Sequence, residues 1–351
     1  MVPYLLLLSI PCLLAIFHPR KINSILFYVV LLVFVFFVGF RYQIGPDWNS
    51  YEYTHLSLLG QDIIVALLHS EPLSYALFWI SENLGFEVFL SNIVAALILS
   101  FGVFSFSRQT LNPWIAIIAA TPYLIIVFGM SGIRQAMGVG VFLYVLSQWQ
   151  KRNAIFRSVG IIIASLFHTS ALFCGLFVIY TLKINILIRI IAILLLSLIV
   201  FYLIKDTSIY SGSFEKYKQT YTEDTDAVFS AGAIYHVGLI MIPAVLGHAF
   251  KSKIKKFIPN DDLLTIGIFG TLALLALNSI STTVASRLTL YFYFIPMLVY
   301  PAMTLAFGKK NRKFIIIVII LTHFAILTVW MLLGNHSIDY IPYRNLLFET
   351  N

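Results

Sequence analysis

Charged side chains are scarce in this chain. Asp, Glu, Lys and Arg make up 11% of its 351 residues, whereas hydrophobic residues make up 60%. A typical soluble domain has about 25% charged residues, and no stretch here is long and polar enough to form a separate soluble domain. Repeated apolar runs of roughly 20 residues match the thickness of a bilayer. The composition therefore predicts an all-α, polytopic integral membrane protein.

Cysteine is equally rare, with two residues, Cys12 and Cys174, both inside apolar runs. This excludes a disulfide framework and a cysteine metal cluster. The sequence also lacks the Gly-rich, Lys-ending loop that holds nucleotide phosphates, which argues against direct use of ATP. Apart from Asp224 and Asp226, the side of the membrane that carries the candidate site residues has no Asp-x-Asp pair and no cluster of His and carboxylates. We therefore expect neither a metal ion nor a cofactor.

The net charge of +8 does not indicate nucleic-acid binding. The basic residues fall in short loops between apolar runs, as they do in the cytoplasmic loops of membrane proteins. These loops mark the inner ends of the expected spans, and they contain Arg20, Lys21, Arg108, Lys151, Arg152, Arg157, Lys183, Lys251, Lys253, Lys255, Lys256, Lys309, Lys310, Arg312 and Lys313.

The apolar runs predict about twelve membrane crossings. Single spans are expected over residues 2–17, 22–40, 86–106, 113–129, 133–149, 184–204, 233–250, 262–280, 286–306 and 314–334. One long helix over residues 158–182 would put every later basic loop outside, so we expect a break near His168 into two short arms. The first run precedes its basic residues, the reverse of a cleaved signal peptide, and should be retained.

Both termini are then outside, and residues 1–351 form a single membrane-embedded domain with outer loops 41–85 and 205–232. In the first loop, the apolar segments 63–69 and 73–80 are too short to span and are expected to be interfacial or re-entrant helices. The second loop carries several aromatic residues, which suit either sugar stacking or a solvated loop: Tyr210, Tyr217, Tyr221 and Phe229.

This topology gathers several titratable residues on the outer side, where the positive-inside bias does not account for arginines. They are Arg41, Asp47, Arg134, His168, Arg287 and Arg344. Gly45-Pro46 forces a turn between the first two. Arg134 follows a glycine-containing break, so the free N–H groups of the new helix and the guanidinium form an anion site. The alternative for each is an ordinary interfacial anchor at a helix end.

Two of these residues have neighbours that suggest a role. Gly138, four residues after Arg134, leaves room for close approach. Tyr291 follows Arg287 at the same spacing and could orient the guanidinium. His168 lies in an apolar setting and could be either a proton carrier or a hydrogen-bonded structural residue.

Several arginines on one lipid-facing surface suit a diphosphate, because guanidinium groups match phosphate oxygens in bidentate geometry. The sequence resembles the EpsG and Wzy group of bacterial polysaccharide repeat-unit polymerases. The resemblance runs in order along most of the chain and rests on Arg41, Gly45, Asp47, Tyr51, Glu71-Pro72, Gly132-Ile-Arg134-Gln135, Phe167-His168-Thr-Ser170-Ala and Ser286-Arg287-Leu-Thr-Leu-Tyr291-Phe.

The resemblance implies a GT-C-like, metal-independent glycosyltransferase in the bacterial inner membrane, with its active site facing outward. It would join undecaprenyl-diphosphate-linked repeat units into O-antigen or exopolysaccharide, with membrane lipid and a chain-length regulator protein as further partners. Arg134, Arg287 and Arg41 are candidates for the cationic cradle, and Asp47, the preferred base, or His168 would accept the proton. The remaining substrate-binding candidates are Tyr51, Gln135, Tyr291, Tyr343 and Arg344.

Two other functions remain open at this stage. A transporter or flippase for lipid-linked saccharides would need a charged path through the middle of the membrane, whereas the ionisable residues here crowd one face. A ligase that moves finished polysaccharide to another lipid uses the same chemistry with a different acceptor. Sequence alone does not separate ligase from polymerase.

Overall fold

The computed structural model describes residues 1–17, 24–206, 231–279 and 281–348. Every regular element within these ranges is helical, which confirms the all-α prediction. Three helices are long and apolar enough to cross a membrane, α6 (Glu87–Ser107), α15 (Asp261–Asn278) and α18 (Gly308–Leu333), and two bent helix pairs would raise the number to five. Helix length alone thus supports fewer crossings than the twelve or so that the apolar runs predict.

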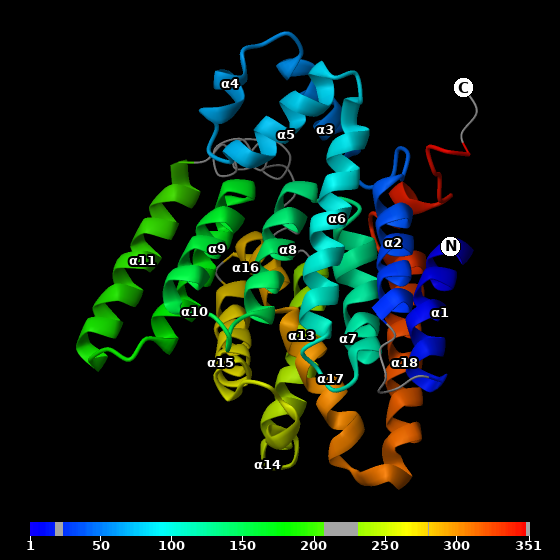
Figure 1. Cartoon of the computed structure of the whole chain (residues 1–351), viewed down its shortest axis with the longest axis vertical. Coiled ribbons are helices and arrows are strands. Elements are labelled where there is room, and N and C mark those ends of the chain that lie inside the picture. The colour runs from blue at the N-terminus through cyan, green and yellow to red at the C-terminus, as the bar shows by residue number, and fades with distance from the viewer. Residues whose placement is uncertain (18–23, 207–230, 280, 349–351) are drawn as a thin grey trace.

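Most helices run side by side in a bundle (Figure 1). Its other members in the first half of the chain are α1 (Val2–Phe17), α2 (Ser24–Gly39), α7 (Pro113–Ala120), α8 (Ile133–Ser147) and α9 (Ala154–Phe167). Those in the second half are α10 (Gly175–Thr181), α11 (Ile186–Asp206), α13 (Ala231–Ala249), α16 (Thr282–Thr289) and α17 (Phe294–Ala306). Helix α8 packs against both α6 and α9 and is buried along most of its length.

Three short helices, α3 (Trp48–Leu58), α4 (Ile63–Leu67) and α5 (Pro72–Asn83), form a cap over one end of the bundle (Figure 1). Helices α4 and α5 confirm the two short helices expected in the first outer loop. Helix α3 was not predicted, because its sequence has no apolar run and its polar and aromatic residues follow no clear period. The second long loop lies outside the described residues.

The expected break at His168 is present. Helix α9 ends at Phe167, His168 is extended with φ −155° and ψ 120°, and a 3-10 segment, η2 (Thr169–Cys174), leads into α10. Two other expected spans are less regular than their apolar runs suggest. Residues 284–306 bend by 41° between Phe292 and Phe294, and α7 continues as a buried π-helix, η1 (Thr121–Phe128).

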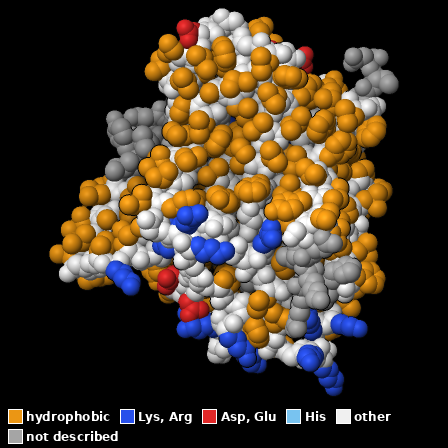
Figure 2. Space-filling model, in the orientation of Figure 1, with side chains coloured by type: hydrophobic (Ala, Val, Ile, Leu, Met, Phe, Trp, Pro, Cys, Tyr) orange, Lys and Arg blue, Asp and Glu red, His pale blue; other side chains and the backbone are white. Residues whose placement is uncertain are grey.

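The two ends of the bundle differ in charge. On the face drawn in Figure 2, lysines and arginines gather toward the end that carries α14 (Lys251–Ile254), and hydrophobic side chains cover most of the remaining surface. The cap lies at the opposite end (Figure 1). We call these the basic end and the cap end. This polarity matches the positive-inside pattern and predicts that the cap faces outward.

Cysteine labelling tests this orientation. Leu68 in the cap is 82% exposed, and Lys310 is an exposed residue at the start of α18, near the basic end. In a variant whose buried native cysteines, Cys12 and Cys174, are replaced by Ala, Leu68→Cys should react with a membrane-impermeant thiol reagent in intact cells. Lys310→Cys should react only after permeabilisation. The opposite pattern would overturn the orientation.

Candidate active site

A group of polar side chains lies beneath the cap, with Glu71 at its centre. We call it the Glu71 cluster, and its members are Asp47, Glu71, Arg134, His168 and Arg287. Glu71 is the residue before Pro72 at the start of α5, and it is 1% exposed. Its Oε2 accepts a hydrogen bond from Arg134 Nη1 at 2.7 Å, and its Oε1 lies 2.5 Å from His168 Nδ1. The same Oε1 accepts the backbone N–H of Thr169 at 3.1 Å. One carboxylate thus joins the cap to the start of α8 and to the break after α9.

These contacts determine the charge of Glu71. Burial raises the pKa of its carboxyl group, but the hydrogen bond from His168, the charge of Arg134 and the N–H of Thr169 outweigh burial and lower the pKa to about 2. Because the folded pKa is below the ordinary value of 4.5, this ionised group stabilises the fold at neutral pH, and that contribution is lost progressively as the pH falls from 4.5 to about 2. Glu71 is therefore a carboxylate at neutral pH.

Arg134 is held at the start of α8 by the break before it. Gly45, with φ 99°, lets the turn after α2 approach this break so closely that a Cβ there would lie 2.4 Å from the carbonyl oxygen of Met130. Next to it, Ser131 Oγ donates to Asp47 Oδ2 at 2.7 Å. The Arg134 side chain remains 29% exposed. Its guanidinium is therefore fixed by Glu71 and still accessible to a ligand.

Aromatic residues of the cap surround Arg134. Its guanidinium carbon lies 5.7 Å from the ring centroid of Tyr75, which stacks on His69 with the ring centroids 3.7 Å apart. Tyr51 of α3 is near enough to Arg134 to interact with it electrostatically. These contacts orient the guanidinium without neutralising it.

His168 presents one ring nitrogen to Glu71. At 2.5 Å from an ionised carboxylate oxygen, Nδ1 carries a proton. No residue in the described part of the chain hydrogen-bonds to the other nitrogen, Nε2. A neutral imidazole oriented by a carboxylate in this way can accept a proton at Nε2. The contact with Glu71 gives His168 the partner expected of a structural residue, and its role as a proton carrier stays a prediction.

Arg287 of α16 completes the cluster. Its guanidinium is partly exposed and interacts electrostatically with Arg134, Asp47, Tyr51 and Glu71. The structure therefore brings together Asp47, Arg134, His168 and Arg287, the four residues that the sequence proposed for catalysis, and adds Glu71 among them.

Gln135 and Tyr291 lie behind the arginines, 5% and 0% exposed. Gln135 Nε2 donates to the backbone oxygen of Arg287 at 2.8 Å, and the Tyr291 hydroxyl lies 2.9 Å from Ser170 Oγ. The Tyr291 hydroxyl therefore bonds to Ser170 instead of orienting the Arg287 guanidinium, because the chain turns as a 3-10 segment after Thr289. Both side chains therefore hydrogen-bond to other residues of the protein, Gln135 to the backbone of Arg287 and Tyr291 to Ser170.

The close approach expected at Gly138 is present. A Cβ at this position would lie 3.1 Å from the Ala164 carbonyl oxygen and 3.5 Å from the Cβ of His168. A side chain here would push α8 away from the end of α9.

Three other substrate-binding candidates lie elsewhere. Arg41 is 1% exposed and donates to the backbone oxygens of Val38 and Ile44 at 3.0 and 3.3 Å, so it fixes the turn after α2 and is not paired with Asp47. The Tyr343 hydroxyl donates to the backbone oxygen of Phe37 at 2.9 Å. Arg344 Nη1 donates to Gln43 Oε1 at 3.1 Å. Each bonds to a protein group away from the Glu71 cluster.

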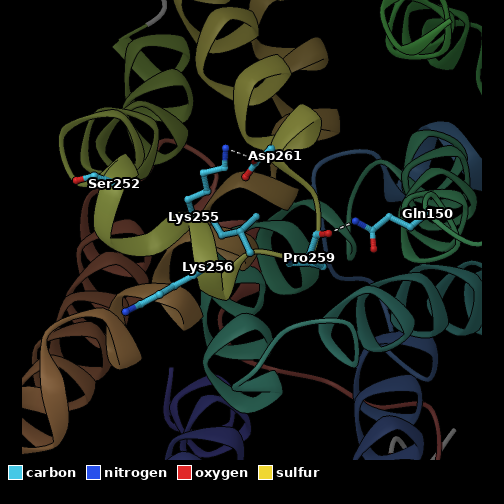
Figure 3. Close-up of a pocket in the computed structure, with 7 residues that line it drawn as sticks. Gln150, Ser252, Lys255, Lys256, Pro259 and Asp261 are labelled. Atoms are coloured by element: carbon cyan, nitrogen blue, oxygen red, sulfur yellow. Dashed lines mark hydrogen bonds and ion pairs between the residues drawn. The ribbon is translucent and has the colours of Figure 1, made fainter. Parts of the chain in front are cut away.

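One hollow of the surface lies away from this cluster. A wide depression of about 610 Å³ lies at the basic end beside α14. Figure 3 shows that two of its polar side chains already have partners, because Lys255 Nζ lies 2.6 Å from Asp261 Oδ2 and Gln150 donates to the backbone oxygen of Pro259. This hollow contains none of the candidate catalytic residues. We therefore place the candidate active site at the cap end.

No group of three His, Cys, Asp or Glu side chains is arranged to hold a metal ion within the residues that the structure describes. Asp224 and Asp226 lie outside that part of the chain. Independence of metal ions stays a prediction.

The fold and the cluster define an all-helical membrane protein in which two arginines flank a carboxylate–histidine pair beneath a helical cap. Residues 24–345 match the EpsG family model, and the chain belongs to the EpsG family. No curated protein and no solved structure matches the chain. Family membership points to a role in polysaccharide biosynthesis.

Proposed function

We propose that this protein is a metal-independent glycosyltransferase that polymerises undecaprenyl-diphosphate-linked oligosaccharide repeats at the outer face of the inner membrane. The bundle would cross the membrane about twelve times, with a GT-C-like arrangement of its outer site. The observation that carries the proposal is the Glu71 carboxylate, which fixes Arg134 and His168 side by side, with Arg287 near enough to interact electrostatically.

In this reaction the growing glycan is the donor, and its anomeric carbon is bonded to the lipid diphosphate. A hydroxyl of the incoming repeat attacks that carbon, a new C–O bond forms, and the C–O bond to the diphosphate breaks. His168 Nε2 accepts the proton of the hydroxyl, and Glu71 stabilises the resulting imidazolium. The electron pair leaves with undecaprenyl diphosphate.

The two guanidinium groups would stabilise the leaving group. Negative charge grows on the diphosphate as the bond breaks, and fixed cations in a water-poor site stabilise such charge strongly. Arg134 is positioned by Glu71, and Arg287 is positioned through the Gln135 hydrogen bond to its backbone. Asp47 is a less suitable base than the sequence suggested, because its carboxylate already accepts a hydrogen bond from Ser131.

The surface glycans of a deletion strain test this proposal. Loss of a polymerase should leave single repeat units in place of long chains, and the wild-type gene should restore the long chains. Long chains that accumulate on the undecaprenyl carrier would identify a ligase instead. Repeat units trapped at the inner face would identify a flippase.

A further inference from the structure

A second cavity lies beneath the cap, between the turn before α3 and the start of α6. Its volume is about 170 Å³. Three aromatic and three acidic side chains dominate its lining, namely Tyr42, Trp48, Phe89, Glu52, Glu82 and Glu87. None of them belongs to the Glu71 cluster, so the cavity is a separate feature of the cap end.

The three aromatic residues lie together on one side of the cavity, which we call the aromatic wall, and Trp48 is inclined at 69° to the ring of Tyr42 and at 58° to that of Phe89. The rings of Tyr42 and Phe89 are nearly parallel, with an interplanar angle of 15° and centroids 6.1 Å apart. Trp48 meets both rings with centroid distances of 6.0 Å. Aromatic rings pack against the C–H groups of a sugar, and the hydroxyl of Tyr42 and the indole N–H of Trp48 are able to bind its hydroxyls.

Glu82 is the buried acidic group of the cavity. It is 7% exposed, and within the part of the chain that the structure describes its carboxyl group has no hydrogen-bond donor and no cationic partner. Burial and the nearby charges of Glu87 and Glu52 raise its pKa. Its oxygens face the cavity and are therefore able to accept hydrogen bonds from hydroxyl or amide donors of a ligand.

The backbone is unusual at the same place. Gln43 and Glu87, with φ of 50° and 48°, adopt the left-handed conformation without being glycine, and both line this cavity. Such conformations are costly and are maintained only where the surroundings enforce them.

We propose that this cavity binds one sugar ring of the glycan substrate, at a position separate from the reacting bond. The inference rests on the proposed function. The volume of about 170 Å³ corresponds to roughly five or six water molecules, which suits a single ring. Because three carboxylates face the cavity, the ring bears no negative charge and offers hydroxyl, amide or amino donors.

The position suits a subsite next to the catalytic cluster. Helix α3 contributes Trp48 and Glu52 to the cavity and Tyr51 to Arg134. A glycan that extends from the reacting bond along α3 would place a neighbouring sugar against the aromatic wall. The cavity would then select the repeat unit without taking part in the chemistry.

Binding of a soluble oligosaccharide tests this subsite. The probe consists of one to three repeats released from the producing strain's own polysaccharide, without lipid or diphosphate, and binding to the protein in nanodiscs is measured by ligand-observed NMR titration. We expect Glu82→Gln and Trp48→Ala to raise the Kd roughly tenfold or more. Tyr53→Ala, which removes a 76% exposed ring from the same helix, should bind like wild type.

Several outcomes would overturn the inference: no binding by the wild-type protein, equal binding by all variants, or thermal stabilisation by Ca²⁺ alone that depends on Glu82. Glu82→Gln preserves the shape of the side chain, so it remains informative if Trp48→Ala does not fold. Failure of this inference is distinguishable from failure of the polymerase proposal. A deletion strain that keeps its long chains refutes the polymerase, whereas this titration reports only on the cavity.

Discussion

Replacing His168 by Gln should reduce the polymerisation rate by about two to four orders of magnitude, the usual contribution of a positioned general base. Gln can still donate to Glu71 but cannot accept the proton of the attacking hydroxyl. The KM for the acceptor should change little, because the arginines and the cap remain in place. The measurement is the rate of chain extension with purified protein, at matched protein concentration and with matched thermal unfolding.

Two control variants separate chemistry from folding. His323→Gln alters another buried histidine, 3% exposed in α18 and bonded to the Ile319 carbonyl oxygen, and should retain activity. Asp47→Asn keeps an acceptor for Ser131 and should lose less than tenfold, about the effect of one hydrogen bond. If Asp47→Asn is inactive while His168→Gln extends chains normally, Asp47 is the base, as the sequence suggested.

Arg287→Lys should leave mostly single repeats. Lysine keeps the charge but has a compact ammonium group, which cannot form two parallel bonds to phosphate oxygens. Removing a comparable charge-stabilising donor costs about 2 to 4 kcal/mol in the transition state, or two to three orders of magnitude in rate. Chain length in cells at matched protein level measures the effect.

Arg108→Lys provides the matched control for this variant. Arg108 is an exposed arginine that follows α6 and donates to the Tyr28 hydroxyl, so its lysine variant should make chains of normal length. If Arg287 merely anchors a helix end in lipid headgroups, lysine should replace it equally well. Long chains from Arg287→Lys would therefore exclude a diphosphate clamp.

Much of the fold could be predicted because bilayer thickness and loop charge constrain helix positions. The break at His168 followed from the sides assigned to the basic loops, and the structure confirms it. The bend near Tyr293 and the π-helix η1 could not be predicted, since they depend on packing within the bundle and leave no pattern in an apolar run. Helix α3 could not be predicted either, because it forms where the cap packs on the bundle and its sequence has no apolar run.

The sequence pointed to some residues of the candidate site and missed Glu71. Arginines on the outer side stand out against the positive-inside bias, so Arg134 and Arg287 could be found from sequence. Glu71 was noted as part of a motif but not as a site residue, because a single carboxylate in a loop has no spacing signal. Its partners Arg134 and Thr169 are 63 and 98 residues away in the chain. The tertiary fold alone brings them together.

The most direct test of the central claim is reconstitution of the purified protein in liposomes, with lipid-linked single repeats as the sole glycan and EDTA present. The proposed function predicts a ladder of longer chains and the release of one undecaprenyl diphosphate for each linkage formed. Arg287→Lys should form almost none. Substrate that crosses the bilayer unchanged, or glycan that appears on a different lipid without a ladder, would contradict the assignment as a polymerase.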